Sequence, residues 1–235
     1  MIDLRYGRHE DVLRDTHVDT LITDPPYGQK THDGHAAGVA TSQSAKRIDS
    51  ANRQHIDYAH WTEADVVRFV ASWAPRVRGW MVALTSHDLI PIWQEAYETA
   101  GRYAFHPIPC VIKGMTVRLG GDGPSSWAVY ACVSRPRTKE YAKWGTLPGA
   151  YVGGRGERTG GGQYTGGKPL WLMNALVRDY SRPGRLVCDP CAGWGTTLIG
   201  AESLGRDAIG AECDRDTYEA AQARIARPMQ RDLFS

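Results

Sequence analysis

The chain has 235 residues, with 28 Lys and Arg against 26 Asp and Glu, so its formal net charge is only +2. This length suits one α/β domain with a full core, and we expect residues 1–235 to form a single domain. The near balance of charge excludes an argument for nucleic-acid binding from net charge alone. Any basic surface must therefore be local.

The composition also limits where the protein works. No apolar run approaches the roughly 20 residues of a membrane span, and the N-terminus lacks the basic-then-apolar form of a signal peptide. The five cysteines do not form a disulfide framework, which indicates a reducing compartment and a cytoplasmic protein with no membrane partner. Cys188 and Cys191 are spaced C-x-x-C without a second pair, so we assign no metal site.

Strand and helix signals alternate along the chain. Apolar runs predict strands at residues 2–6, 19–24, 80–85, 103–112, 127–133, 185–189 and 207–212. Helices are predicted at residues 9–15, from Thr62 to before Pro75, from Ser86 toward Gly101, and at 168–181, 196–204 and 215–226. Thr62 and Asp65 have the spacing of a capping box, Ser86 is the expected cap of its helix, and Gly205 is the expected helix C-cap. This alternation favours an α/β fold with a doubly wound, mostly parallel sheet.

The most informative stretch is Asp24-Pro25-Pro26-Tyr27, which follows the apolar run at residues 21–23. An exocyclic amine on a base is a poor nucleophile because its lone pair is delocalised into the ring. A carboxylate at Asp24 and the carbonyl of Pro25 could accept its two N–H bonds, and the lone pair could then point at a methyl donor. Two consecutive prolines fix φ, so that carbonyl is held rigidly, and Tyr27 offers a ring on which a flipped base can stack. The alternative for the tetrapeptide alone is an Asp-Pro turn that closes a strand.

A glycine-rich loop follows the apolar run at residues 186–188 and reads Asp189-Pro190-Cys191-Ala192-Gly193-Trp194-Gly195-Thr196-Thr197. Its two glycines let the backbone approach a ligand before a helix begins. Glu212 ends the next apolar run, at about the spacing of a ribose-binding carboxylate. A nicotinamide dehydrogenase is the rival interpretation. We reject it because its fingerprint wants Gly or Ala at position 198, where this chain has Leu198, and because it leaves residues 24–27 unexplained.

Together, in this order, the two motifs resemble those of the amino-methylating DNA methyltransferases, whose signatures are D/N/S-P-P-Y/F/W and D-P-F-x-G-x-G-T-T. Those enzymes transfer a methyl group from S-adenosyl-L-methionine to the N6 amine of adenine or the N4 amine of cytosine. An acidic motif that precedes the glycine loop resembles the permuted, beta-type order of the family. The resemblance implies a Rossmann-like methyltransferase fold in circularly permuted order, with base flipping and direct in-line transfer. It is strongest over residues 20–28 and 168–214.

The resemblance also implies roles for individual residues. The catalytic residues would be Asp24, Pro25, Pro26 and Tyr27. The cofactor-binding residues would be Asp189, Pro190, Cys191, Gly193, Gly195, Thr196, Thr197, Glu212 and Asp214, with Lys168 and Pro169 as the K-P motif that closes over the methionine end of the cofactor. Three positions depart from the pattern: Cys191 replaces the usual Phe, Trp194 replaces a frequent Ser, and Gly7-Arg8 stands where Gly-Asp is common.

Two polar segments carry the residues expected to contact double-stranded DNA. Residues 28–60 directly follow the catalytic motif and are expected to form a mobile, substrate-gripping loop. Residues 134–167 are expected to be a small target-recognition insertion, in which four aromatics (Tyr141, Trp144, Tyr151 and Tyr164) are interleaved with basic residues. A solvated glycine-rich loop is the alternative for the second segment. The expected DNA contacts are Lys30, His32, Lys46, Arg47, Arg135, Arg137, Lys139, Lys143, Arg155 and Arg158.

The choice of base follows from the resemblance. Asp24 favours adenine N6, because family members with D-P-P-Y mostly methylate adenine, whereas beta-type enzymes with S-P-P-Y mostly methylate cytosine N4. Cytosine N4 stays open because a carboxylate accepts from either amine. A catalytically silent nucleic-acid-binding relative is a further alternative, against which the intact tetrapeptide and glycines argue. The resemblance points to a bacterial or phage source and to restriction–modification, while the recognition sequence, a cognate nuclease and a homodimer stay open.

The C-terminal tail, residues 228–235, carries one more motif. Gln230-Arg231-Asp232-Leu233-Phe234 resembles the Q-x-D/S-L-F peptide with which bacterial enzymes dock on the replicative sliding clamp. Leu233 and Phe234 would enter an apolar pocket, and Gln230 would supply polar contacts. A terminus that folds back on its own domain is the alternative.

Overall fold

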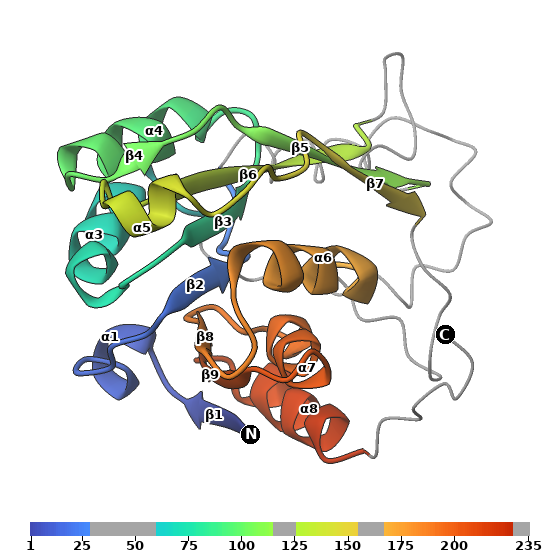
Figure 1. The fold of residues 1–235 in the computed structure, drawn as a ribbon. Helices are drawn as coiled ribbons and strands as arrows, with labels where there is room; N and C mark the ends of the chain where they lie inside the picture. Colours follow the sequence, from blue (N-terminus) through green and yellow to red (C-terminus); the bar gives the residue numbers. More distant parts are fainter. Residues whose placement is uncertain (29–59, 115–125, 155–166, 228–235) are drawn as a thin grey trace, which may run out of the picture.

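The computed structural model describes residues 1–28, 60–114, 126–154 and 167–227. Within these ranges a nine-stranded sheet runs in the order β1-β9-β8-β2-β3-β6-β5-β7, and β4 also pairs with β6 (Figure 1). The strands are β1 (Ile2–Tyr6), β2 (Thr20–Thr23), β3 (Met81–Thr85), β4 (Tyr103–Ala104), β5 (Ile108–Lys113), β6 (Ala128–Arg135), β7 (Tyr151–Gly154), β8 (Leu186–Asp189) and β9 (Asp207–Glu212).

Most of the sheet is parallel. Each neighbouring pair from β1 through β9, β8 and β2 to β3 is parallel, β6 is antiparallel to β3 and β5, and β7 is parallel to β5. The run that forms β2 is buried at all four positions, as expected for a parallel strand covered on both faces. The prediction of a doubly wound, mostly parallel sheet with a Rossmann-like fold is confirmed.

Helices cover both faces of the sheet. Successive strand residues point to opposite faces, so a strand that is buried along its whole length needs a helix on each side. On β2, Leu21 packs with α3 (Glu63–Trp73) and α4 (Ile90–Thr99), whereas Ile22 packs with α6 (Leu170–Tyr180) and α7 (Thr196–Ser203). Helix α6 lies across the middle of the sheet (Figure 1). The remaining helical elements are α1 (His9–Val12), the 3₁₀ turn η3 (Ala74–Arg76), α5 (Lys139–Ala142) and α8 (Arg215–Ile225).

Two predicted helix ends are confirmed. The Thr62 hydroxyl accepts from the backbone N–H of Asp65, and the Thr62 N–H donates to the Asp65 carboxylate over 2.8 Å, which completes the capping box at the start of α3. Gly205 has a left-handed φ of +75° just after α7, where a residue with a Cβ would be strained.

Several boundaries differ from the prediction. Ser86 does not cap the helix that follows it: α4 begins at Ile90 after Leu89, with Pro91 in its first turn, and the Ser86 hydroxyl donates to Asp88 instead. The strand predicted at residues 103–112 is divided into β4 and β5, and Pro107, which cannot donate a ladder hydrogen bond, lies between them. The short elements α5 and β7 were not predicted, and α1 ends earlier, at Val12.

The five cysteines are all free thiols, in agreement with the absence of a predicted disulfide framework. Burial raises the pKa of the Cys110 and Cys132 thiols to about 12, so both are inert at neutral pH. In the part of the chain that the structure describes, no helix is long and apolar enough to cross a membrane.

Candidate active site

The two sequence motifs meet at the carboxyl ends of adjacent strands. β2 pairs with β8, with Leu21 opposite Cys188, so Asp24 and Asp189 leave the sheet next to each other. The chain proceeds from β8 through α7 to β9 on one side, and from β2 through α3 to β3 on the other. The strand order therefore reverses between β2 and β8, and such a switch point is where open α/β sheets bind ligands. A buried hydrogen bond of 2.8 Å from the Thr23 hydroxyl to the Asp189 carboxylate joins the two motifs.

Asp24 accepts a hydrogen bond at each carboxylate oxygen. The Tyr27 hydroxyl donates to Oδ1 over 2.8 Å, and the Lys168 ammonium donates to Oδ2 over 2.6 Å as an ion pair. Lys168 reaches this position because it immediately precedes Pro169, which is the N-cap of α6. Burial, followed by the nearby Asp24 carboxylate, raises the pKa of Tyr27, so its hydroxyl stays protonated and remains a donor.

The glycine loop between β8 and α7 is organised around Asp189. This carboxylate is 2% exposed and accepts from Thr23, from the Thr197 hydroxyl over 2.5 Å and from the Cys191 N–H over 3.1 Å. Burial nevertheless raises its pKa to about 6, because it outweighs these three donors. A set of donors aimed at one buried carboxylate fixes the shape of the loop.

Two glycines give the loop its conformation. Gly193 and Gly195 have φ of +50° and +71°, in the left-handed region, and Gly195 is the N-cap of α7 ahead of Thr196. A Cβ built on Gly193 would meet no heavy atom of the described residues within 4 Å. The backbone there faces open space, which leaves room for a ligand.

Glu212 lies across from this loop at the end of β9. Its carboxylate accepts from the Gly193 N–H over 2.9 Å and from the Asp214 N–H over 2.8 Å, and burial raises its pKa. A carboxylate has about four acceptor positions, so it can still accept from the hydroxyl groups of a ligand. The Gly7 N–H donates to the Glu212 carbonyl over 2.9 Å. The Gly7-Arg8 segment, which stands where Gly-Asp is common in the family that the motifs resemble, therefore lies beside Glu212.

Within the described contacts Asp214 caps a helix, and its predicted contact with the cofactor stays a prediction. Its carboxylate accepts from the Thr217 N–H over 2.8 Å and caps α8, and this hydrogen bonding lowers its pKa. The cap orients α8 against β9, so Asp214 supports the site through the helix.

Sequence reasoning missed two residues that hold the site together. Thr23 bonds to Asp189, and its only signal was a polar side chain at the end of an apolar run. Arg224, on α8, donates to the Trp194 carbonyl over 2.9 Å and to the Thr196 hydroxyl over 2.8 Å, which fastens the glycine loop. No local pattern could reveal Arg224, because the contact depends on how α8 packs.

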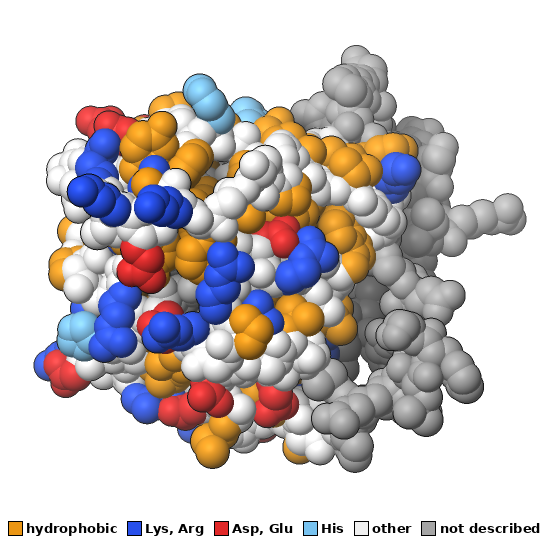
Figure 2. All heavy atoms as spheres, in the orientation of Figure 1, with side chains coloured by type: hydrophobic (Ala, Val, Ile, Leu, Met, Phe, Trp, Pro, Cys, Tyr) orange, Lys and Arg blue, Asp and Glu red, His pale blue; other side chains and the backbone are white. Residues whose placement is uncertain are grey.

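Four of the expected DNA contacts lie at the other edge of the sheet. β6 is antiparallel to β3, with Met81 opposite Ser134, so the chain leaves β6 at the amino end of the parallel strands, away from Asp24. Arg135, Arg137, Lys139 and Lys143 follow there. Arg78 and Arg185, both 3.8 Å from the Asp19 carboxylate, lie at the same edge. Figure 2 shows Lys and Arg side chains gathered on the face that carries α5.

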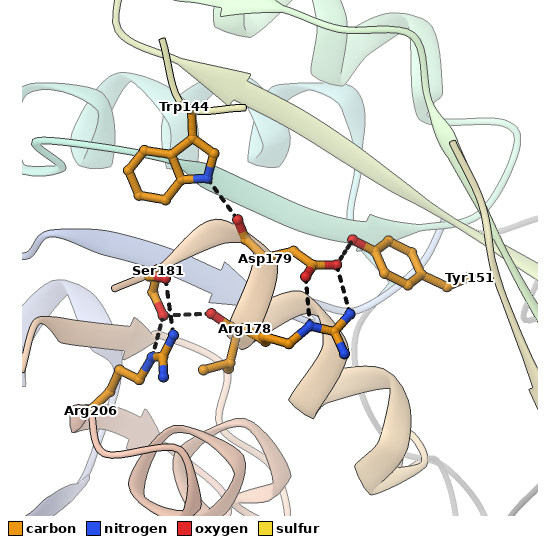
Figure 3. A network of polar contacts seen from close by, with 7 residues as sticks. Trp144, Tyr151, Arg178, Asp179, Ser181 and Arg206 are labelled. Atoms are coloured by element: carbon orange, nitrogen blue, oxygen red, sulfur yellow. Dashed lines mark hydrogen bonds and ion pairs between the residues drawn. The ribbon is translucent and has the colours of Figure 1, made fainter. Parts of the chain in front are cut away.

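The aromatic residues of this segment pack within the protein. The Trp144 ring N–H donates to the Asp179 carbonyl over 2.8 Å, and the buried Tyr151 donates from its hydroxyl to the Asp179 carboxylate over 2.8 Å (Figure 3). Tyr141 stacks on Trp144, with ring centroids 5.4 Å apart. In the same region Arg206 donates to the Ser181 hydroxyl over 3.0 Å. Tyr141, Trp144 and Tyr151 therefore have packing contacts within the protein, and their expected stacking on bases stays a prediction.

The other expected contacts fall outside the described residues. They are Lys30, His32, Lys46, Arg47, Arg155, Arg158 and Tyr164, together with Gln230, Leu233 and Phe234 of the tail.

Solved structures share this fold. The M1.HpyAVI–SAM complex superimposes with a TM-score of 0.70 at 20% sequence identity, over 97% of this chain and 100% of that chain. The PvuII DNA methyltransferase, a cytosine-N4-specific enzyme, has a TM-score of 0.65 at 13% identity, over 97% of this chain and 87% of that chain. At these identities the likeness establishes a class of fold, the Rossmann-like methyltransferase fold.

Sequence comparisons are more specific than the fold. Residues 125–223 match the family model N6_N4_Mtase, a DNA methylase family. YubD of Escherichia coli (strain K12), named as a candidate methylase, is 25% identical over 219 residues, 89% of this chain and 82% of that protein. The Type II methyltransferase M.HindIII of Haemophilus influenzae is 39% identical over 64 residues, 27% of this chain and 21% of that enzyme. These matches support a DNA methylase of the N6/N4 class and do not distinguish the two amines.

Proposed function

We propose that the protein is an S-adenosyl-L-methionine-dependent DNA methyltransferase that methylates the N6 amine of adenine. The observation that carries this proposal is the position of Asp24 at the switch point, adjacent to the loop formed by Asp189, Gly193 and Glu212. A methyl acceptor held at Asp24 and a methyl donor held by the loop would share one edge of the sheet. The sequence match to N6/N4 DNA methylases supports the same reaction class.

The residues of the loop fit the proposed cofactor. Glu212 presents carboxylate oxygens to ribose hydroxyls, and the backbone at Gly193 leaves open space beside them. Burial of Asp189 and its three donors keep the loop in one shape before any ligand arrives. When bound, the cofactor supplies an electrophilic methyl group on a sulfonium, which carries no phosphate and needs no pyrophosphate cradle.

The D-P-P-Y residues have separate tasks in this proposal. Asp24 and the Pro25 carbonyl accept the two N–H bonds of the target amine and orient its lone pair for in-line transfer. Tyr27 supports the flipped base with its ring, and its hydroxyl fixes the Asp24 carboxylate. This is catalysis by orientation, which can supply about 7–11 kcal/mol when reacting groups are well aligned.

The test is mass spectrometry of nucleosides from unmethylated DNA after incubation with the protein and S-adenosyl-L-methionine. We expect N6-methyladenine from the native protein and none above background from Asp24→Ala. Asp3→Ala is the matched control, because Asp3 is an exposed carboxylate paired with Arg5 on β1, and it should methylate normally. N4-methylcytosine as the product would keep the mechanism and overturn the base. No methylated base, with cofactor binding confirmed, would favour the silent nucleic-acid-binding alternative.

A further inference from the structure

We infer that Lys168 is a movable counter-ion that occupies the acceptor oxygen of Asp24 until an anionic group of the cofactor draws its ammonium away. Cofactor binding would then open Asp24 to the target amine. This inference rests on the proposed function and assigns to Lys168 a positioning role in the coupling of the two substrates.

Each carboxylate oxygen of Asp24 already accepts from one donor in the structure, and one of the two donors is a cation. Tyr27 and Lys168 take one oxygen of Asp24 each, and the ammonium of Lys168 also lies 4.8 Å from the centroid of the Tyr27 ring. The side chains of Lys168 and Asp24 are only 11% and 21% exposed, so the pair is largely shielded from water. An incoming base would meet an occupied carboxylate and a cation at the ring on which it should stack.

A neutral amine cannot easily displace this ammonium. Hydrogen bonds between ionised partners are roughly twice as strong as those between neutral groups, and burial reduces screening by water. A second anion near Lys168 could form an equally strong charged hydrogen bond with the ammonium, and so could draw it away from Asp24. The flexible four-carbon stem of lysine allows its ammonium to change partners without a change in the backbone.

The proposed cofactor provides such an anion in the carboxylate of its methionine portion. Asp189, the buried carboxylate of the glycine loop, already accepts from Thr23, Thr197 and Cys191, so it is a poor alternative partner. Asp24 and the ligand carboxylate would therefore compete for one ammonium. Coupling between two binding events is reciprocal. A change that weakens the ion pair between Asp24 and Lys168 should therefore strengthen binding of the ligand carboxylate to Lys168.

This competition can be measured by calorimetry without knowledge of the DNA site. The probes are S-adenosyl-L-homocysteine, which carries the amino-acid carboxylate, and 5′-methylthioadenosine, which lacks it. Asp24→Asn frees the ammonium and should tighten binding of S-adenosyl-L-homocysteine about fivefold or more, the lower end of typical coupling. Lys168→Met should weaken that binding at least about tenfold, as for loss of a charged hydrogen bond. Neither variant should change the affinity for 5′-methylthioadenosine.

Two controls separate this mechanism from its alternatives. In the double variant, the gain from Asp24→Asn should disappear; a gain that persists would show direct repulsion between Asp24 and the ligand, and would overturn the inference. Lys143→Met, at the opposite edge of the sheet, should bind both probes like the native protein. Equal binding of both probes in all variants would overturn the inference while the proposed function stands. Failure of the native protein to bind either probe would overturn both.

Discussion

Asp189 is a buried carboxylate whose ionisation the fold opposes. Its pKa is raised from 3.8 to about 6, because burial outweighs the donors Thr197, Thr23 and Cys191. The folded protein thus holds the proton of Asp189 more tightly than the unfolded chain does. As the pH rises from about 4 to about 6, the unfolded chain loses this proton before the folded protein does. The contribution of Asp189 to the free energy of unfolding therefore falls over this interval and stays constant above it.

Asp189→Asn tests this effect, because an amide has no proton to lose. We expect the free energy of unfolding of Asp189→Asn, minus that of the native protein, to increase between pH 4 and 6 by at most about 3 kcal/mol, so the variant gains stability relative to the native protein. Urea denaturation at several pH values measures this difference. Other titrating groups are common to both proteins and cancel. A difference that stays constant from pH 4 to 7 would contradict the assignment.

At the scale of elements, the end of α6 holds the chain between β6 and β7 in place. Tyr151 of β7 donates to the Asp179 carboxylate, which also pairs with Arg178 (Figure 3). Tyr151→Phe removes only the hydroxyl, and we expect it to lower the free energy of unfolding by about 1–3 kcal/mol. Tyr103→Phe is the matched control. Tyr103 is 41% exposed, and this substitution should change the free energy of unfolding by no more than about 0.5 kcal/mol. Equal losses in the two variants, measured by urea unfolding, would contradict the role of the network.

Sequence reasoning succeeded where an element carries its own signals. The capping box at Thr62 and the strands that end in Asp24 and Asp189 have local patterns, and the order of helices and strands implied that two parallel strand ends would carry the motifs. It failed for β7, whose last two residues are glycines with little strand propensity, and for α5, which is only four residues long.

The candidate site was predicted to a similar extent. The residue types at 24–27, 189–197 and 212 indicate their chemistry, but the partner of each carboxylate depends on packing between distant segments. The bond from Lys168 to Asp24 and the role of Asp214 as a helix cap are of this kind. Composition also missed a contact: aromatics among basic residues at 134–151 favoured base stacking, but did not reveal that Trp144 and Tyr151 attach this segment to α6.

At the scale of the whole molecule, the sheet has two chemically different edges. The carboxyl ends of the parallel strands carry Asp24, Asp189 and Glu212, whereas Lys139 and Lys143 follow β6 at the amino ends. Figure 2 shows Lys and Arg side chains gathered on the face that carries α5. The net charge of +2 hides this separation, since it averages over both edges. A short duplex bound for catalysis must reach Asp24 and cannot at the same time cover the opposite edge.

Salt dependence of DNA binding distinguishes the two edges. The logarithm of the binding constant falls with the logarithm of salt concentration by about 0.9 for each phosphate that a basic residue neutralises. We expect the double substitution of Lys139 and Lys143 by Gln to leave this slope unchanged for a duplex of one helical turn. Arg155→Gln is the matched comparison: β7 ends at Gly154 on the catalytic edge, Arg155 is the next residue, and its loss should reduce the slope by about one. Fluorescence anisotropy at several salt concentrations measures both. A smaller slope for the double Lys variant would place the duplex on the edge of the sheet that carries α5, away from Asp24.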